Sequence, residues 1–184
     1  MDRLGASVRT LYEKNAAQHA MTPGDKVREL GSVEKAKDWA RNDATNFINT
    51  NMGQAKDLYE KSNQTNSEAS KLILTVGAFK SFGKGAHTIM DGASPAHRDF
   101  QVYDTQPYQV LGLMSPVVGV TAFGVDMIDH ANVEARQPTD GEMNKMVDDL
   151  RMQFLNAFGR EAYEGAVPEA DRKATEERKR KQAP

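Results

Sequence analysis

The chain has 184 residues, which is enough for one domain with a substantial core and short for two. Hydrophobic residues make up 39% and charged residues 27%, a balance typical of a globular protein. The net charge of −2 gives no overall attraction to nucleic acid or to an acidic membrane, and the lack of cysteine excludes disulfides, thiolate metal sites and a cysteine nucleophile.

The first third of the chain predicts helices separated by short polar breaks. Thr22-Pro23 is typical of a helix start with proline in the first turn. Ser32 begins a second helix that extends to about Lys61, and the polar run 62–67 ends it. One face of this second helix is apolar, and its residues recur at helical spacing: Val33, Ala36, Ala40, Ala44, Phe47 and Ile48.

A more apolar helix follows, and strand signals are nearly absent from the whole chain. This helix is well formed from Leu72, is expected to loosen through Gly83 and Gly85, and ends near Gly92. His87 lies close to its carboxyl end, where a cation suits the helix dipole, and His19 has no local pattern around it.

The second half of the chain contains the same kinds of helix-start signal and apolar stripe. Ser115-Pro116 predicts the start of a long apolar helix that ends near Pro138. Thr139 and Glu142 have the spacing of a capping box. The helix they open has an apolar stripe and a plausible stop at Gly159; the stripe is Met143, Met146, Val147, Leu150, Phe154, Leu155 and Phe158.

The last residues are highly charged and have little to bury. Pro168 predicts the start of a final helix, and the basic run 178–181 follows two glutamates, which is typical of a solvated helix end. The sequence therefore predicts an all-α fold, a single compact domain of six to seven helices over residues 1–165, with a charged and exposed helix or tail over 166–184.

The segment 94–103 combines more chemical groups than any other. Ser94 and Pro95 are a good N-cap and first-turn pair, which predicts a short helix from Pro95 to Tyr103 and a turn over 104–107. His97 and Arg98 then lie near a helix N-terminus, where free N–H groups favour an anion such as a phosphate. Asp99 would pair with Arg98 or orient His97; the alternative is a capped helix whose His97 satisfies a loop carbonyl.

A second histidine has acidic neighbours. Asp126, His130 and Glu134 are spaced four and four, so they lie along one face of the helix after Pro116. A carboxylate that orients an imidazole makes a usable general base or metal ligand. Ordinary ion pairs on an exposed helix face explain the same spacing, and there is no His-Glu-x-x-His pair to support a zinc protease site.

Two glycine-bearing apolar segments, 72–90 and 110–125, raise the question of a membrane. Neither supplies the roughly 20 consecutive apolar residues that a spanning helix needs. They form either a buried helical pair or a hairpin that inserts after unfolding, as in pore-forming toxins. Close helix contact through glycine suits both readings.

The run from Met90 to Tyr103, with Ser94-Pro95-Ala96-His97 and Phe100-Gln101 inside it, resembles a segment of the variable C-terminal domains of bacterial RHS-repeat proteins. His130, Glu134 and the helix that ends at Phe158-Gly159 also look similar. The resemblance covers roughly residues 90–160.

Such domains are typically polymorphic toxins used in competition between bacteria. The resemblance implies an effector that is secreted, often by type VI machinery, as the tip of an RHS-repeat shell. It also implies delivery into a target cell and neutralisation by a cognate immunity protein. No cofactor or metal follows from it, and activities in this class range from nucleases to pore formers.

The hypothesis favoured by the sequence is an enzyme with a His-centred site. His97, with Asp99, would face His130 with Asp126 and Glu134, and the target would be a nucleic acid, which the net charge does not favour, or another phosphate-containing molecule. Side chains of the first segment would bind it: Ser94, Arg98, Gln101 and Tyr103. The alternatives are a membrane-inserting pore former and a non-catalytic helical interaction module.

Overall fold

The computed structural model describes residues 16–103 and 138–166, together with Lys173 and Arg180. It is mostly helical, which confirms the all-α class. Four α-helices lie in the described ranges: α2 (Gly24–Leu30), α3 (Val33–Gln64), α4 (Glu68–Ala93) and α7 (Asp140–Ala166). A short 3₁₀ helix, η1 (Ala16–His19), and two strands of two residues each, β1 (Thr22–Pro23) and β2 (Val102–Tyr103), complete the described elements.

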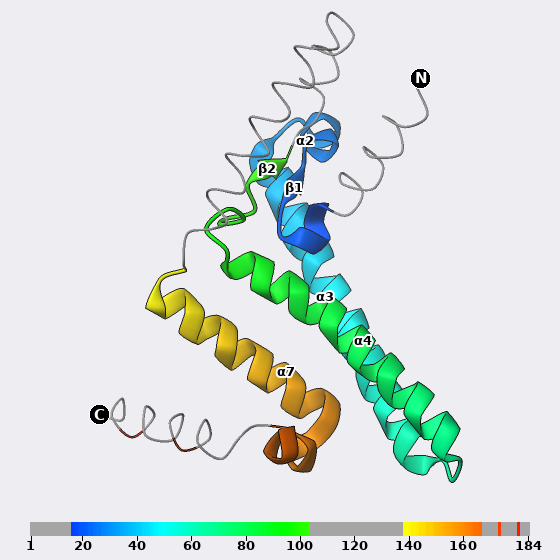
Figure 1. Ribbon diagram of the computed structural model, residues 1–184. Helices are drawn as coiled ribbons and strands as arrows, with labels where there is room; N and C mark the ends of the chain where they lie inside the picture. The colour runs from blue at the N-terminus through cyan, green and yellow to red at the C-terminus, as the bar shows by residue number, and fades with distance from the viewer. Residues whose placement is uncertain (1–15, 104–137, 167–172, 174–179, 181–184) are drawn as a thin grey trace, which may run out of the picture.

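Helices α3 and α4 form a long antiparallel hairpin (Figure 1). The segment η1–β1–α2 lies at the end of the hairpin away from the α3–α4 turn. Helix α7, yellow to orange in Figure 1, runs beside the hairpin from the end of α4 towards that turn. The turn itself is only Thr65–Ser67, which is why the two helices lie antiparallel and side by side.

The hairpin is joined along a seam in which α4 contributes small side chains. The buried residues of α4 follow spacings of three and four: Ala78, Ser81, Gly85 and Thr88. From α3, Ala55 shares a cluster with Ala78, and the side chains of Asn51 and Met52 lie closest to Gly85. Small residues on α4 therefore let the two backbones approach closely, and the alanines Ala36, Ala40 and Ala44 predicted from the sequence are also buried on α3.

The expected starts of the long helices are confirmed. The Ser32 hydroxyl accepts a hydrogen bond from the Lys35 amide at 3.4 Å, and α3 begins at the next residue. Thr139 and Glu142 form the reciprocal capping box: the carboxylate accepts from the Thr139 amide at 2.9 Å, and the Thr139 hydroxyl accepts from the Glu142 amide at 3.3 Å.

The expectation that α4 loosens at its glycines is wrong. Helix α4 continues without a break through Gly83 and Gly85, because Gly85 packs closely against α3 and this packing outweighs its low helix propensity. The expected stop at Gly159 is confirmed: its φ of 82° and ψ of 172° are not helical, so the helix breaks there, and a second helical segment continues to Ala166.

An aromatic cluster fixes α7 to the hairpin. Phe158 is 5% exposed and stacks on Phe79 at 4.7 Å between ring centroids. The Tyr59 ring meets the same Phe158 edge-on at 5.2 Å, and Phe154 lies edge-on to Phe82 at 5.4 Å. Phe154 and Phe158 of the apolar stripe predicted for 143–158 therefore supply the contact with both long helices, whereas Met143 and Val147 of that stripe are exposed.

The expected helix from Pro95 to Tyr103 is wrong. Ser94 caps the carboxyl end of α4, with its amide bonded to the Asp91 carbonyl at 2.9 Å, and turns follow as far as Asp99. Asp99 and Phe100 both have positive φ, 57° and 52°, which no helix can propagate. The segment then forms β2, which pairs in parallel with β1: Thr22 lies opposite Val102.

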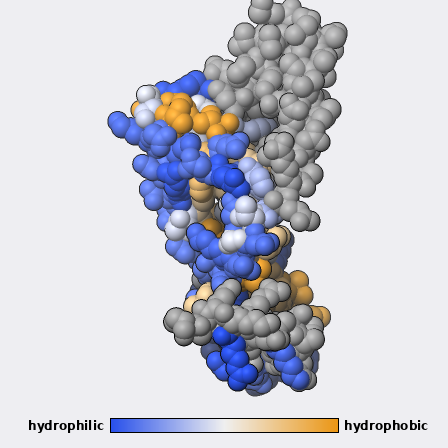
Figure 2. Space-filling view, turned by 90° about the vertical axis from the view of Figure 1, so that its left-hand side faces the viewer, coloured by the Kyte–Doolittle hydropathy of each residue, from blue (hydrophilic) through white to orange (hydrophobic). Residues whose placement is uncertain are grey.

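The described part of the face drawn in Figure 2 is mostly hydrophilic. Apolar residues gather near its upper left and at its lower right edge. Among the described residues, no helix is long and apolar enough to span a bilayer. The expected helix over 116–138, the turn over 104–107, the second apolar segment and all but isolated residues of the charged tail lie outside the described ranges.

The seam predicts opposite effects for one substitution at two glycines of α4. A Cβ built on Gly85 would lie 2.9 Å from Cε of Met52 and 3.4 Å from the Ile48 carbonyl oxygen, whereas one on Gly83 meets nothing within 4 Å. Gly85→Leu should lower the free energy of unfolding by about 1–3 kcal/mol. Gly83→Leu should leave it unchanged or raise it by about 0.5–1 kcal/mol through helix propensity.

Chemical denaturation followed by circular dichroism measures both variants. Because the two substitutions change helix propensity equally, the difference between them reports packing against α3. Equal stability of the two variants would contradict the close approach at Gly85.

Candidate functional site

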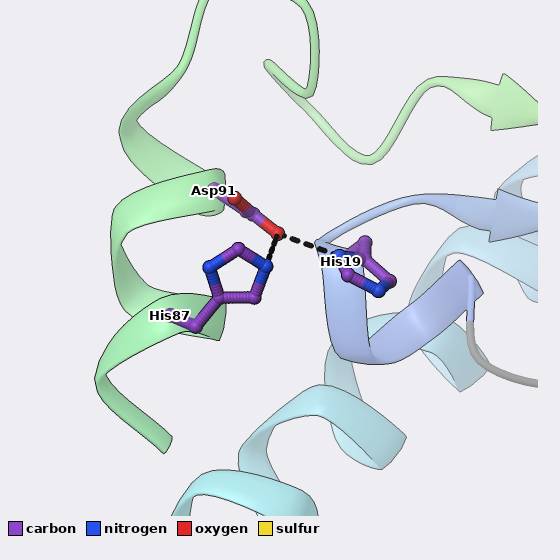
Figure 3. Close-up of side chains that lie close together, drawn as sticks. All are labelled: His19, His87 and Asp91. Atoms are coloured by element: carbon purple, nitrogen blue, oxygen red, sulfur yellow. Dashed lines mark hydrogen bonds and ion pairs between the residues drawn. The ribbon is translucent and has the colours of Figure 1, made fainter. Parts of the chain in front are cut away.

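Three polar side chains from two distant parts of the chain converge at the end of the hairpin (Figure 3). His19 comes from the last residue of η1, and His87 and Asp91 come from one face of α4, four residues apart. The Asp91 carboxylate oxygen Oδ2 accepts a hydrogen bond from His19 Nδ1 at 2.9 Å and lies 3.3 Å from His87 Nε2. Both imidazoles therefore point at the same oxygen.

The cluster is accessible but anchored. The Asp91 side chain is 14% exposed, against 42% for His19 and 57% for His87. The two rings lie edge-to-face with centroids 5.1 Å apart. A substrate or an ion can therefore reach both imidazoles from solvent, while the carboxylate that joins them is held mostly inside.

Two hydrogen bonds fix η1 against α4 and so place His19. The Thr88 hydroxyl donates to the Gln18 carbonyl at 2.6 Å. The next carbonyl along the chain, that of His19 itself, accepts a hydrogen bond from Nδ1 of His97. Ala20 then reverses the chain with a φ of 53°. His19 is thus held on both sides of its Cα by groups from α4 and from the segment after it.

His97 is buried, 4% exposed, and its observed partner is a backbone carbonyl. This is the alternative in which His97 satisfies a loop carbonyl. The expected anion site at a helix N-terminus is not formed, because no helix starts at Ser94. Ser94 instead accepts a hydrogen bond from the Ala96 amide at 3.3 Å and stabilises the turn.

The charged neighbours of His97 do not pair with each other. Asp99 lies 2.6 Å from both Lys37 and Arg41 of α3, and Arg98 lies 2.7 Å from Glu142 of α7. The expected contact of Asp99 with Arg98 or His97 is therefore replaced by two bridges that tie the segment to the helices on either side of it.

The other two residues expected to bind a substrate lie in and beside β2. Gln101 is exposed, and its carbonyl accepts from the Thr22 amide at 2.9 Å. Tyr103 is half-buried opposite Pro23. Their backbones serve the strand pair that closes this end of the molecule.

Hydrogen bonds shift the pKa values of Asp99 and Arg41. The pKa of the Asp99 carboxyl is lowered, first by the hydrogen bond from Lys37 and then by that from Arg41. The pKa of Arg41 is raised, chiefly by its hydrogen bond to Asp99. The bridge is therefore fully charged at neutral pH.

A pocket of about 490 Å³ lies between α3, α4, α7 and the segment after α4, and the three clustered side chains are not part of its lining. Ala20, Thr88 and Gly92, which line it, are sequence neighbours of the three clustered residues. Its charged lining is mixed, with two cations and two anions: Arg41, Lys145, Glu142 and Asp149. A volume of this size suits a small molecule.

The same three side chains are the metal-binding candidate of the described residues. Their ligand atoms all lie within 4.8 Å of one another. Sequence reasoning assigned His87 only to the helix dipole and missed this cluster. The spacing of four between His87 and Asp91 was available as a signal, whereas nothing local marked His19, which lies 72 residues from Asp91.

The second half of the expected site cannot be compared with this geometry. Asp126, His130 and Glu134 lie outside the described residues.

Comparison of the chain with protein-family models, curated proteins and solved structures gave no match. The geometry of the described residues is therefore the main support for a function.

The Asp99 bridge predicts a pH-dependent loss of stability. Asp99→Asn keeps a side chain that tolerates positive φ but removes the charge, so the variant should melt at a lower temperature than wild type at pH 7. Because the pKa of Asp99 is lower in the folded protein than its unfolded value, near 3.8, the ionised carboxylate stabilises the folded state above that pH. This stabilisation is lost as the pH falls through the pKa of the folded state. The difference between the two proteins should therefore vanish in acid.

Thermal unfolding between pH 7 and pH 2 measures this difference. Asp38→Asn is the matched control, because Asp38 is exposed and, among the residues that the structure describes, bonds to Arg41 of its own helix at 2.8 Å rather than to another segment. A deficit for Asp99→Asn that stays constant with pH, or one equalled by the control, would contradict the assignment.

Proposed function

We propose that the chain is an antibacterial effector domain of the RHS type, an all-α domain of six to seven helices over residues 1–165 with a charged tail over 166–184. It is secreted as part of an RHS-repeat protein, enters a target bacterium and is neutralised there by an immunity protein. Its activity is enzymatic and is directed at a phosphate-containing molecule through a His-centred site.

The observation that supports this proposal is the placement of the segment that resembles RHS toxin domains. Asp91, inside that segment, joins two accessible imidazoles, and His97, also inside it, bonds to the backbone of His19. Both described parts of the resembling region line the pocket. Gly92 and Phe100 come from the part before residue 104, and Glu142 and Lys145 come from the part after residue 138.

The chemistry proposed for the cluster follows from its side chains. Two imidazole nitrogens and one carboxylate oxygen converge where the oxygen of a water molecule or of a substrate can be bound and activated for attack. Lys145 at the pocket supplies positive charge for a phosphate group and Asp149 offsets it, whereas the charges of Arg41 and Glu142 are already paired with Asp99 and with Arg98. This balance and the pocket volume favour a target of nucleotide size over a long nucleic acid.

In this arrangement His97 is a positioning residue. Its buried ring holds the carbonyl of His19, so it acts on the site through the backbone. His130, with Asp126 and Glu134, remains the second candidate centre proposed from the sequence.

Killing of bacteria from inside tests the proposal. Expression of the chain in the cytoplasm of a susceptible host should stop growth, and His19→Ala, His87→Ala and Asp91→Asn should each lower the killing by at least about 100-fold, the contribution typical of one acid–base or ligand group. Lys84→Ala, one turn earlier on α4 and exposed, is the matched control. Colony counts after induction, at equal protein levels, measure the effect.

Undiminished killing by all three variants would contradict the assignment of this cluster. Loss of killing in His130→Ala alone would move the site to the second centre. A harmless wild-type chain in every compartment would favour the interaction module instead.

A second candidate function, membrane attack, is supported by one observation on α4. Four large apolar side chains in the first half of this helix are exposed: Leu72 by 66%, Ile73 by 72%, Val76 by 58% and Phe79 by 46%. Such a stripe suits contact with a lipid surface. The helix itself is not apolar enough to cross a bilayer.

Leakage of dye from liposomes tests this second function. If the stripe inserts into lipid, the wild-type chain should release dye, and Ile73→Asp should abolish release because a charge is costly in the membrane. Asn63→Asp adds the same charge at an exposed polar position and should have no effect. Intact liposomes with wild-type protein would exclude this function, and periplasmic killing without cytoplasmic killing would favour it.

A further inference from the structure

We propose that His19 Nδ1, His87 Nε2 and Asp91 Oδ2 bind one divalent transition-metal ion, with zinc as the best fit. The binding itself needs no assumption about toxicity; only its use in catalysis rests on the function proposed above.

The spacing of the three atoms suits a tetrahedral ion. Zinc binds imidazole nitrogen and carboxylate oxygen at about 2.0–2.2 Å, so two ligand atoms at a tetrahedral angle lie about 3.3–3.5 Å apart. The carboxylate oxygen is 2.9 Å from the first nitrogen and 3.3 Å from the second, and no pair exceeds 4.8 Å. Small rotations of the side chains therefore bring all three to bonding distance.

The kinds of ligand select the kind of metal. Two imidazoles and one carboxylate are typical of zinc and of neighbouring transition metals, whereas magnesium and calcium prefer oxygen ligands throughout. Three protein ligands leave a fourth position for water or substrate, which is the arrangement of catalytic rather than structural zinc. The half-exposed imidazoles face solvent, where that position would lie.

The structure also supplies the support that a metal site needs. The backbone on both sides of His19 is fixed, by Thr88 at the Gln18 carbonyl and by His97 at its own carbonyl. His87 and Asp91 are one turn apart on a continuous helix, so their relative position is set by α4. A ligand group that is already ordered loses little conformational entropy when the ion binds.

A metal would also explain why two imidazoles converge on a single carboxylate oxygen. In the geometry described, the nitrogen of each ring that faces Asp91 carries a hydrogen. For the ion to bind, that proton must leave the metal-facing nitrogen: a neutral ring then carries its one proton on the other nitrogen, and a doubly protonated ring releases one proton to solvent. The same three atoms then bind the ion without any change of backbone.

Titration of the purified full chain, without a histidine tag, with zinc chloride tests the proposal. Calorimetry should show one equivalent bound, and His19→Ala, His87→Ala and Asp91→Asn should each weaken binding by at least about 10-fold. Asp148→Asn, an exposed carboxylate on α7, is the matched control and should bind as wild type. Circular dichroism establishes that each variant is folded.

Cobalt chloride provides a second readout. A site of two imidazoles and a carboxylate should give the visible absorption of four- or five-coordinate cobalt. That absorption should disappear in His87→Ala.

Absence of zinc binding by the folded wild type, or equal binding by all three variants, would overturn the metal site. Zinc binding by a chain that kills no bacteria would overturn only the function proposed above, and killing that depends on His87 in a chain that binds no zinc would overturn only the metal site.

Discussion

The close contact between α3 and α4 is the constraint on which the rest of the structure depends. On the α4 side the seam contains only small residues (alanine, serine, glycine and threonine), so the helices approach closely and Met52 of α3 packs over Gly85. The aromatic side chains lie on the flanks of the hairpin. On one flank they meet the phenylalanines of α7, and on another the stripe that includes Leu72 and Ile73 stays exposed. A hairpin of this kind is a stiff support whose own core is thin.

That stiffness matters for the candidate site because the site lies at one end of the hairpin. His87 and Asp91 are fixed by α4, and the only further component is one residue from a short 3₁₀ helix. Polar contacts at backbone atoms, rather than a large apolar core, place that residue. The site therefore combines two ligands on a rigid element with a third whose position depends on a few hydrogen bonds.

The sequence could predict the parts of this structure that are encoded locally. Ser32 and the pair Thr139–Glu142 identify helix starts because a cap acts within four residues, and the alanines of α3 identify a packed face because helical spacing is fixed. Ser94-Pro95 carries the same local signal, yet Ser94 ends a helix here. The difference comes from the pairing of Gln101 and Val102 with Thr22, which joins the segments that precede and follow the hairpin in the sequence.

The candidate site shows the same division. The spacing of His87 and Asp91 is visible in the sequence, whereas the approach of His19 depends on how η1 folds back onto α4. The role of His97 was likewise ambiguous, because a histidine beside a serine and an arginine suits an anion site as well as a structural hydrogen bond. Only the placement of the His19 carbonyl distinguishes the two. Local chemistry therefore identified an important segment and left two surroundings open for its histidine, of which the structure shows the contact with a loop carbonyl.

The pairing of β1 with β2 has a consequence for how the domain assembles. Thr22 bonds to Phe100, 78 residues along the chain, and such distant contacts form slowly because a long loop must close first. The hairpin, whose turn is local, can form before this loop closes. His19 reaches Asp91 only when the loop between Thr22 and Phe100 has closed. A partly folded chain would therefore have helices but not the cluster of His19, His87 and Asp91.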